Sequence, residues 1–318
     1  MKVSKQSIDM GHIPSTDFTT RIGSVVLPNP IMTASGTSGQ GAELSKYFDL
    51  SSLGAIVVKS LHAKPWPGSP APRLHPTSAG MINSVGLQGP GIEEWLINDL
   101  PALEKAGARV IVSIWGQTVE EFEQAAKLLA GASDAVIAVE VNASCPNLED
   151  RTNLFAHSAV ATAEVVKASL VSERPCWAKL SSNTPDLPQI AKAAEEAGAE
   201  AVTVANTLLG MVINTDTRKP LLGAGRGGVS GPAIKPIAIR SVFDTYASNL
   251  EIPIIGVGGI AKGEDVSEFL MAGATAIQIG TATFANPRAP QKILKGFSKW
   301  CKDQGLDQVN KLIGVAHG

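Results

Sequence analysis

The stretch AVIAVEVNASCPN, residues 135–147, runs from a nearly continuous apolar segment directly into polar residues, a cysteine and a proline. Seven similar runs, rich in Val, Ile and Ala, recur along the chain. Continuous apolarity is typical of strands that are covered on both faces, so the pattern predicts a parallel sheet. The eight runs are IMTASG (31–36), AIVVKS (55–60), RVIVSIWG (109–116), AVIAVEVNAS (135–144), CWAKLS (176–181), AVTVANT (201–207), PIIGVGG (253–259) and AIQIGTA (276–282).

Helix-like segments separate most of these runs, and several have Asp, Thr or Pro near the start and Gly at the end, as helix caps require. Eight strand–helix units close most economically into a (β/α)₈ TIM barrel, and 318 residues suit that fold. An open doubly wound sheet is the alternative, because periodicity does not show closure. The predicted helices cover residues 93–107, 119–131, 156–170, 186–198, 232–247 and 263–273.

Two stretches, residues 61–91 and 208–231, break the alternation because they are rich in Gly, Pro and polar residues. Both follow predicted strand ends, where a barrel builds its site. We therefore predict excursions that cover the C-terminal face of the barrel, within one domain that spans residues 1–318.

The composition and charge of the chain argue against nucleic acid and anionic membranes as partners. With 44% hydrophobic residues, a net charge of −2 and no dense Lys/Arg stripe, the chain is not expected to bind nucleic acid or an anionic membrane. It has no signal-like or membrane-spanning apolar run, so we expect a soluble, cytoplasmic protein. Its three cysteines, Cys145, Cys176 and Cys301, lie far apart without a C-x-x-C pair, so no metal site is expected.

Polar residues and glycines gather at the predicted strand ends, which would share one mouth of the barrel. The glycines after the last two strands let backbone N–H groups approach a phosphate. A pair of tight turns is the alternative, but the spacing between the two turns favours a phosphate site. Sugar phosphates, nucleotides and flavin mononucleotide (FMN) would all fit. These strand-end residues are Ser35, Lys59, Ser113, Asn142, Lys179, Asn206, Gly258, Gly259, Gly280 and Thr281.

Two lysines and four asparagines narrow the choice of ligand. Lys59 and Lys179 each end an apolar strand, where an unpaired ammonium is costly unless it reaches water, so an anionic partner is expected. Amides offer donors and acceptors without charge and suit a pyrimidine dione, although each taken singly is more often a turn or cap residue. The asparagines are Asn83, Asn142, Asn147 and Asn206.

Cys145 lies in a loop just beyond a predicted strand and precedes Pro146. A lone thiol there is either an ordinary buried cysteine, as we expect of Cys176 and Cys301, or a nucleophile or general base. Among the histidines, only His157 is a plausible neighbour for a protease-like pair. A base that takes a proton from carbon needs no such relay.

Seven motifs resemble, in order and spacing, the class 1 dihydroorotate dehydrogenases, from about Val25 to Pro287. NASCPN and NSVGLQ are the specific ones. The motifs are KS (59–60), MINSVGLQGPG (81–91), VNASCPN (141–147), NTLLG (206–210), GGVSGPAIKPIA (227–238), GVGGI (256–260) and QIGTA (278–282).

This resemblance implies an FMN-bearing barrel that oxidises dihydroorotate to orotate in de novo pyrimidine biosynthesis. Cys145 matches the family's general base at C5 of the substrate, with hydride passing from C6 to flavin N5. The matching substrate-binding positions are Lys59, Asn83, Gly86, Leu87, Asn142, Asn147, Asn206 and Thr207. The matching flavin-binding positions are Ser35, Lys59, Ser60, Ser113, Asn142, Lys179, Gly231, Gly258, Gly259, Gly280 and Thr281; Ser113 stands where the family commonly has Asn.

The resemblance also implies partners. Class 2 members use a serine base and a membrane-associating N-terminal extension, whereas this chain has Cys145 and no such helix. The GGVSGPAIKPIA stretch resembles the class 1B branch, in which an iron–sulfur and FAD subunit passes electrons to NAD. Because this chain has no cysteine cluster and no separate dinucleotide fingerprint, those cofactors would lie in the partner subunit, beside a homodimeric core.

Two other functions remain compatible with the residues alone. The first is a flavin-free barrel in which Cys145 is a covalent nucleophile, as in IMP-dehydrogenase-like chemistry. The second is a non-catalytic barrel that binds a phosphate ligand or serves only as a subunit.

Overall fold

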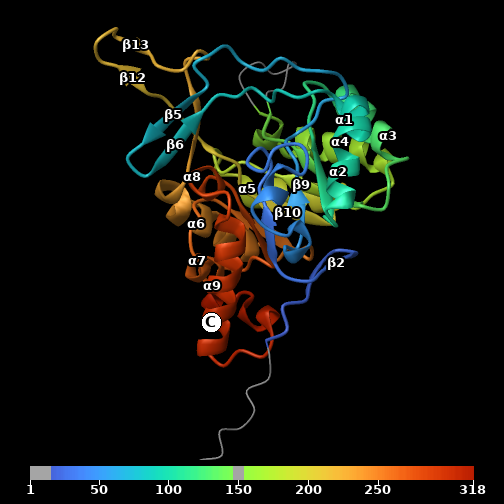
Figure 1. Ribbon diagram of the computed structural model, residues 1–318, viewed down its shortest axis with the longest axis vertical. Helices are drawn as coiled ribbons and strands as arrows, with labels where there is room; N and C mark the ends of the chain where they lie inside the picture. The colour runs from blue at the N-terminus through green and yellow to red at the C-terminus, as the bar shows by residue number, and fades with distance from the viewer. Residues whose placement is uncertain (1–15, 146–153) are drawn as a thin grey trace, which may run out of the picture.

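A barrel of eight parallel strands forms the centre of the computed structural model, which describes residues 16–145 and 154–318 (Figure 1). The strands run in the order β3-β16-β15-β10-β9-β8-β7-β4. A parallel bridge between Met32 and Ala55 joins the two outer strands, so the sheet closes into the predicted TIM barrel and the open-sheet alternative is wrong. The eight predicted runs became β3 (Ile31–Thr33), β4 (Ile56–Val57), β7 (Val110–Ile114), β8 (Val136–Asn142), β9 (Cys176–Lys179), β10 (Ala201–Val204), β15 (Ile254–Val257) and β16 (Ala276–Ile279).

Every predicted helical segment contains a helix. The segment 93–107 is divided at Asp99, because Pro101 has no N–H to continue the helix and its ring crowds the preceding turn. The segment 232–247 begins with a 3₁₀ turn, Pro232–Ile234. The helices are α1 (Ile92–Asn98), α2 (Leu100–Lys105), α3 (Val119–Leu129), α4 (Ala159–Ser169), α5 (Leu187–Glu196), α6 (Lys235–Tyr246), α7 (Gly263–Met271), α8 (Ala282–Ala285) and α9 (Ala289–Asp303).

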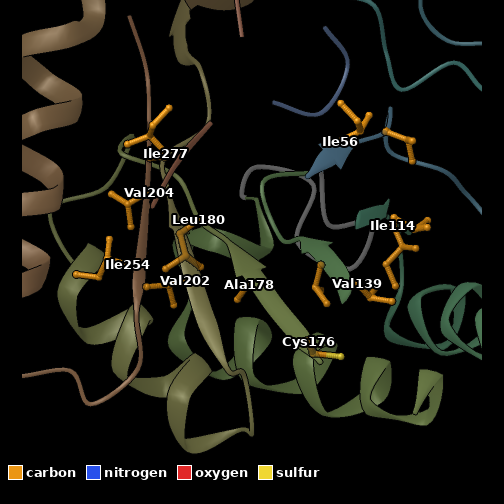
Figure 2. Packing of buried hydrophobic residues seen from close by; sticks show 14 of the residues in the cluster. Ile56, Ile114, Val139, Cys176, Ala178, Leu180, Val202, Val204, Ile254 and Ile277 are labelled. Atoms are coloured by element: carbon orange, nitrogen blue, oxygen red, sulfur yellow. The ribbon is translucent and has the colours of Figure 1, made fainter. Parts of the chain in front are cut away.

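Successive strand residues point to opposite faces and so build two layers. Val139, Val202 and Ile254 belong to the large apolar layer between strands and helices (Figure 2). Alternate residues such as Ala138 and Trp177 belong to a second, smaller cluster inside the barrel. Continuous apolar strands are therefore needed because both faces are buried.

A short hairpin that the sequence pattern did not predict closes the N-terminal end of the barrel. It consists of β1 (Thr20–Ile22) and β2 (Val25–Leu27), which pair antiparallel. Ile22 and Leu27 are fully buried in the inner cluster. This apolar plug leaves the opposite end of the barrel for a site.

The two predicted excursions meet at that opposite end. Residues from both form one antiparallel sheet in the order β11-β14-β6-β5, in which Gly228 pairs with Asn83. A further hairpin projects beyond this sheet (Figure 1). The strands are β5 (Leu74–Thr77), β6 (Gly80–Asn83), β11 (Leu208–Gly210) and β14 (Gly227–Ser230), with β12 (Ile213–Asn214) and β13 (Lys219–Pro220) in the hairpin.

Within residues 16–145 and 154–318, no helix combines the length and apolarity needed to cross a bilayer. The same residues contain no cluster of His, Cys, Asp and Glu that could hold a metal ion.

Candidate active site

A cavity of about 1360 Å³ opens at the C-terminal ends of the strands, beneath the antiparallel sheet. Its walls come from seven of the eight barrel strands or the residues just after them, together with β6 and β14. Of the residues singled out from the sequence, those that line it are Ser35, Lys59, Ser60, Asn83, Gly86, Leu87, Asn142, Cys145, Lys179, Asn206, Thr207, Gly231, Gly258, Gly259, Gly280 and Thr281.

Two predicted site residues are not among the cavity-lining ones. Ser113 is fully buried in β7, and its hydroxyl lies 2.9 Å from that of Ser60. Ser60 thus separates Ser113 from the cavity, and its contribution to a ligand would be indirect. Asn147 lies outside the described residues.

A chain of hydrogen bonds fixes the amides along the cavity wall. Asn142 Nδ2 donates to Ser60 Oγ at 3.3 Å, and Asn206 Nδ2 donates to Asn142 Oδ1 at 3.4 Å. Asn206 Oδ1 in turn accepts the backbone N–H of Thr207 at 2.8 Å. Each amide is therefore oriented before a ligand arrives, which reduces the entropy lost on binding.

Lys179 is buried within a polar network inside the barrel. Its Nζ lies 3.5 Å from Glu140 and within hydrogen-bond reach of Gln278 and Ser35, at 3.5 and 3.4 Å. Glu140, itself fully buried, also accepts from Gln278 Nε2 at 2.6 Å and Thr203 Oγ1 at 3.2 Å. The positive charge of Lys179 is thus held in place at the cavity floor.

Lys59 differs, because its ammonium has no hydrogen-bond acceptor or carboxylate partner among the described residues. Burial and the nearby charge of Lys179 lower the pKa of Lys59 to about 8. Its side chain lines the cavity. A bound anion would supply the missing counter-charge, so Lys59 marks the cavity as a site for an anionic ligand.

Cys145 follows β8 and is only 1% exposed, yet it belongs to the cavity wall. Its Sγ lies 3.2 Å from the carbonyl oxygen of Gly116 and 3.0 Å from that of Asn142, both as acceptors. Burial raises the pKa of this thiol to about 12, so it is protonated in this arrangement. Among the described contacts, no hydrogen bond joins His157 to it. Cys176 and Cys301 are buried in β9 and α9, as expected.

At one end of the cavity, the wall consists of the glycine turns that follow β14, β15 and β16. Gly259 has φ +76°, and a Cβ there would come within 2.7 Å of Lys235 Cβ, so the turn has no space for a side chain. The Asp265 carboxylate in α7 accepts the N–H groups of Ala261 and Lys262, which fixes the following residues. Thr281 Oγ1 bonds Ser230 Oγ at 2.8 Å and ties β16 to β14.

Sequence reasoning missed other residues in the cavity wall. Asn183 donates to the Thr207 carbonyl oxygen at 3.0 Å and accepts the Leu209 N–H at 2.9 Å, so it holds the second excursion in place. The polar run SSNTP (181–185), one residue after the end of β9, is the signal that could have revealed it. Arg226, in the Gly-rich second excursion, was missed for lack of any local pattern.

The charged side chains that line the cavity are mostly cationic. Among the described residues that line the cavity, Glu264 is the only one with a carboxylate side chain. A cavity lined by one sign of charge raises the local concentration of oppositely charged ligands. The cations are Lys59, Lys179, Arg226, Lys262 and Lys292.

Comparison with known proteins finds similarity along nearly the whole chain. The family model described as dihydroorotate dehydrogenase matches residues 18–300. A relative from Desulforamulus reducens, named dihydroorotate dehydrogenase B (NAD(+)), catalytic subunit, is 45% identical over 302 residues, which cover 95% of this chain and 99% of the relative. Proteins of the same name from Alkaliphilus oremlandii and Trichlorobacter lovleyi are 43% and 42% identical, over 92% and 95% of this chain and 96% and 99% of their own lengths.

These matches extend over the barrel, the glycine turns and both excursions, and they confirm the resemblance found in the sequence motifs. The chain belongs to the dihydroorotate dehydrogenase family of enzymes.

Proposed function

We propose that this chain catalyses the oxidation of dihydroorotate to orotate in pyrimidine synthesis, with FMN as its cofactor and Cys145 as its general base. The observation that carries the proposal is the meeting of three kinds of group in one cavity. These are an ammonium that has no counter-charge among the described residues, Lys59; a row of oriented amides; and a thiol, Cys145. Each matches one requirement of an anionic pyrimidine dione that must lose a proton from carbon.

The residues present fit FMN. At one end, the turns at Gly231, Gly259 and Gly280 bring backbone close to the cavity without side chains, as a phosphate requires. On the floor, the fixed ammonium of Lys179 suits an electron-rich ring edge. When bound, FMN supplies the acceptor for two electrons, a role that protein side chains do not fill.

Lys59 and the asparagines would bind and orient the substrate. The carboxylate of dihydroorotate would pair with the Lys59 ammonium and remove the cost of its burial. Asn83 donates to the Gly228 carbonyl oxygen at 3.3 Å, which leaves its own amide oxygen for a ring N–H. Asn142 and Asn206, already bonded to each other, would fix the opposite edge of the ring.

Cys145 would take the proton from C5 as the C5–C6 double bond forms. FMN, when bound, would supply the acceptor for the hydride from C6. Only the thiolate accepts a proton, so the thiol must first release to solvent the hydrogen that it shares with the carbonyl groups of Gly116 and Asn142. The reaction should therefore accelerate as the pH rises toward the pKa of this thiol.

We further infer a partner subunit that carries FAD and an iron–sulfur centre and uses NAD, beside a homodimeric core. The relatives' names describe a catalytic subunit and NAD(+), which supports this. Exposed apolar side chains on the antiparallel sheet and its projecting hairpin support a protein contact there. They are Leu74, Leu209, Met211 and Ile213.

Anaerobic addition of dihydroorotate to the purified protein tests the central proposal. We expect a yellow protein whose flavin absorbance disappears as orotate forms. A colourless protein that does not take up added FMN would contradict the proposal.

A further inference from the structure

Behind Cys145 lies a polar pair, His62 and Glu121, that has no part in the binding of cofactor or substrate proposed above. His62 Nε2 lies 3.4 Å from Glu121 Oε2, and the two side chains are 6% and 30% exposed. Neither residue lines the cavity. The pair joins the segment after β4 to the first turn of α3.

The hydrogen bonds of the imidazole indicate how the pair is oriented. The backbone N–H of Lys64 lies 3.1 Å from His62 Nδ1. The carbonyl oxygen of Lys64 lies 3.2 Å from the same Nδ1, and the other ring nitrogen, Nε2, faces Glu121. The rings of Trp66 and Trp115 pack against the imidazole with centroids at 5.6 and 5.0 Å, which holds it in this place.

Glu121 is connected to the thiol through one short backbone segment. Its Oε2 accepts the N–H of Gln117 at 2.6 Å, and the preceding carbonyl, that of Gly116, accepts from Cys145 Sγ at 3.2 Å. Gly116 also packs tightly on α3, because a Cβ there would lie 2.7 Å from Glu121 Cβ and 2.9 Å from Phe122 N. The position of the thiol's acceptor therefore depends on Glu121.

A helix cap explains part of this arrangement. Thr118 and Glu121 have the spacing of a capping box, and Thr118 Oγ1 accepts the Glu121 N–H at 3.4 Å. A cap requires an acceptor oxygen at position 121 but neither a negative charge nor a buried histidine partner. A helix cap therefore does not explain why Glu121 lies beside the buried His62 and close to the peptide that contacts the thiol.

We propose that Glu121, which lies beside His62, is a positioning residue for Cys145: its carboxylate fixes the Gly116 carbonyl that receives the thiol hydrogen, and it places a negative charge behind the sulfur. The inference rests on the proposed function in treating Cys145 as the base.

The electrostatics around the sulfur agree with this geometry. Burial raises the pKa of the Cys145 thiol, the hydrogen bonds lower it, and the charge of Glu121 raises it further. The other ionisable groups of this part of the molecule are Lys59 and Lys179, which line the same cavity, His62 beside Glu121 and His157 after the loop, while Glu149, Asp150 and Arg151 lie outside the described residues.

Glu121→Gln tests the charge, because glutamine keeps an acceptor oxygen for the cap and for Gln117. The matched control is Glu120→Gln, which makes the same change at the exposed neighbouring position of the same helix turn. In the FMN-loaded protein, the ultraviolet absorbance of the thiolate is read immediately after a rapid pH jump. Subtracting the curve of the same variant carrying Cys145→Ser isolates residue 145.

We expect the thiolate curve of Glu121→Gln to move to lower pH by roughly half a unit to one unit. The Glu120→Gln curve should move by less than about 0.2 unit, because an exposed charge is screened. Equal curves for the two variants would overturn the inference. If Glu121→Gln does not hold FMN, His62→Leu replaces it. Loss of the polar imidazole beside Glu121 lets the carboxylate turn away, so the thiolate curve should move in the same direction, and an unmoved curve overturns the inference.

The rate of flavin reduction by dihydroorotate, measured over the same pH range, separates this inference from the proposed function. If Cys145 is the base, the reduction profile should move with the thiolate curve in each variant. If the pH dependence of the reduction rate does not shift with the thiolate curve, the role of Cys145 as the base is contradicted. The effect of Glu121 is decided by the absorbance curves alone.

Discussion

At the level of single residues, the resting state of Cys145 is unusual for a base. The thiol is buried, donates to backbone carbonyl groups and has a pKa raised to about 12. Such a group is inert toward chance oxidants and alkylating agents, since only the thiolate reacts. The proposed mechanism therefore combines protection of the thiol at rest with activation during turnover.

Cys145→Ser should keep FMN but reduce the rate of flavin reduction by about a hundredfold or more, because a serine hydroxyl is a much weaker base at neutral pH. Stopped-flow spectroscopy under anaerobic conditions measures this rate. The control is Cys301→Ser, which makes the same replacement at a buried site in α9 outside the cavity wall. Reduction at the normal speed in Cys145→Ser would remove the thiol from the mechanism.

The pKa of Lys59 predicts how binding of the product orotate depends on pH. Burial and Lys179 lower this pKa to about 8, so the free ammonium loses its proton above that pH, whereas a bound carboxylate stabilises the charged form. The dissociation constant of orotate should therefore rise above pH 8, by up to about tenfold per pH unit. Titration of the flavin spectrum with orotate measures it.

Lys59→Gln serves as the comparison for that experiment. It should bind orotate more weakly at pH 7, with a dissociation constant that stays level between pH 7 and 9. A wild-type curve that is equally level would show that the carboxylate of the ligand does not depend on this ammonium.

Many of the cavity-lining residues could be located from the sequence because parallel strands bring their C-terminal ends to one mouth. Lys59, Asn142 and Lys179 all follow this rule. Ser113 also ends a strand, but whether a short side chain reaches the cavity depends on its neighbour, and Ser60 covers it. Asn183 lies one step further along its loop, and its role depends on a segment more than 20 residues away.

At the level of secondary structure, elements set by a local sequence pattern could be predicted, whereas those that depend on distant partners could not. The barrel strands could be predicted because burial on both faces imposes a local apolar pattern. The antiparallel sheet above the cavity could not, because β6 pairs with β14, a partner about 145 residues away with few apolar residues. The break between α1 and α2 was visible in Pro101, but its exact place depends on packing.

The turn between β15 and α7 gives a prediction at this level. Asp265 is 3% exposed and accepts hydrogen bonds from Ala261 N, Lys262 N and Lys235 Nζ at 2.8, 3.0 and 2.8 Å. Burial alone would raise the pKa of its carboxyl, but these bonds bring it below its ordinary value. Asp265→Asn should destabilise the protein by about 1–3 kcal/mol at pH 7 and weaken FMN binding, because the amide cannot satisfy all three donors.

The pH dependence distinguishes the carboxylate from a simple packing effect. A lowered folded-state pKa contributes stability that is present above the unfolded pKa and is lost as the pH falls through the folded value. The difference in unfolding free energy between wild type and Asp265→Asn should therefore shrink below about pH 4. Urea unfolding measures it, and Asp244→Asn, on the exposed side of α6, should change it little at either pH.

At the level of the whole molecule, charge is distributed unevenly. The chain carries a net charge of −2, yet the cavity wall contains five Lys and Arg side chains and one carboxylate among the described residues. Bound FMN and dihydroorotate together bring roughly three negative charges, which this excess of cations would balance. We propose that residues 1–318 form one domain organised around this cavity.

The distribution of cysteines in the chain also limits which electron acceptor can reoxidise the flavin. An iron–sulfur cluster needs several cysteine ligands close together, and the chain has three cysteines on separate elements. We therefore expect the purified protein to be reduced by dihydroorotate but not reoxidised by NAD at a useful rate. After anaerobic reduction, fumarate, a quinone and NAD are added in separate samples while the flavin spectrum is followed. Addition of an FAD and iron–sulfur subunit from a relative should restore reoxidation by NAD, and rapid reoxidation by NAD without it would contradict the inferred partner.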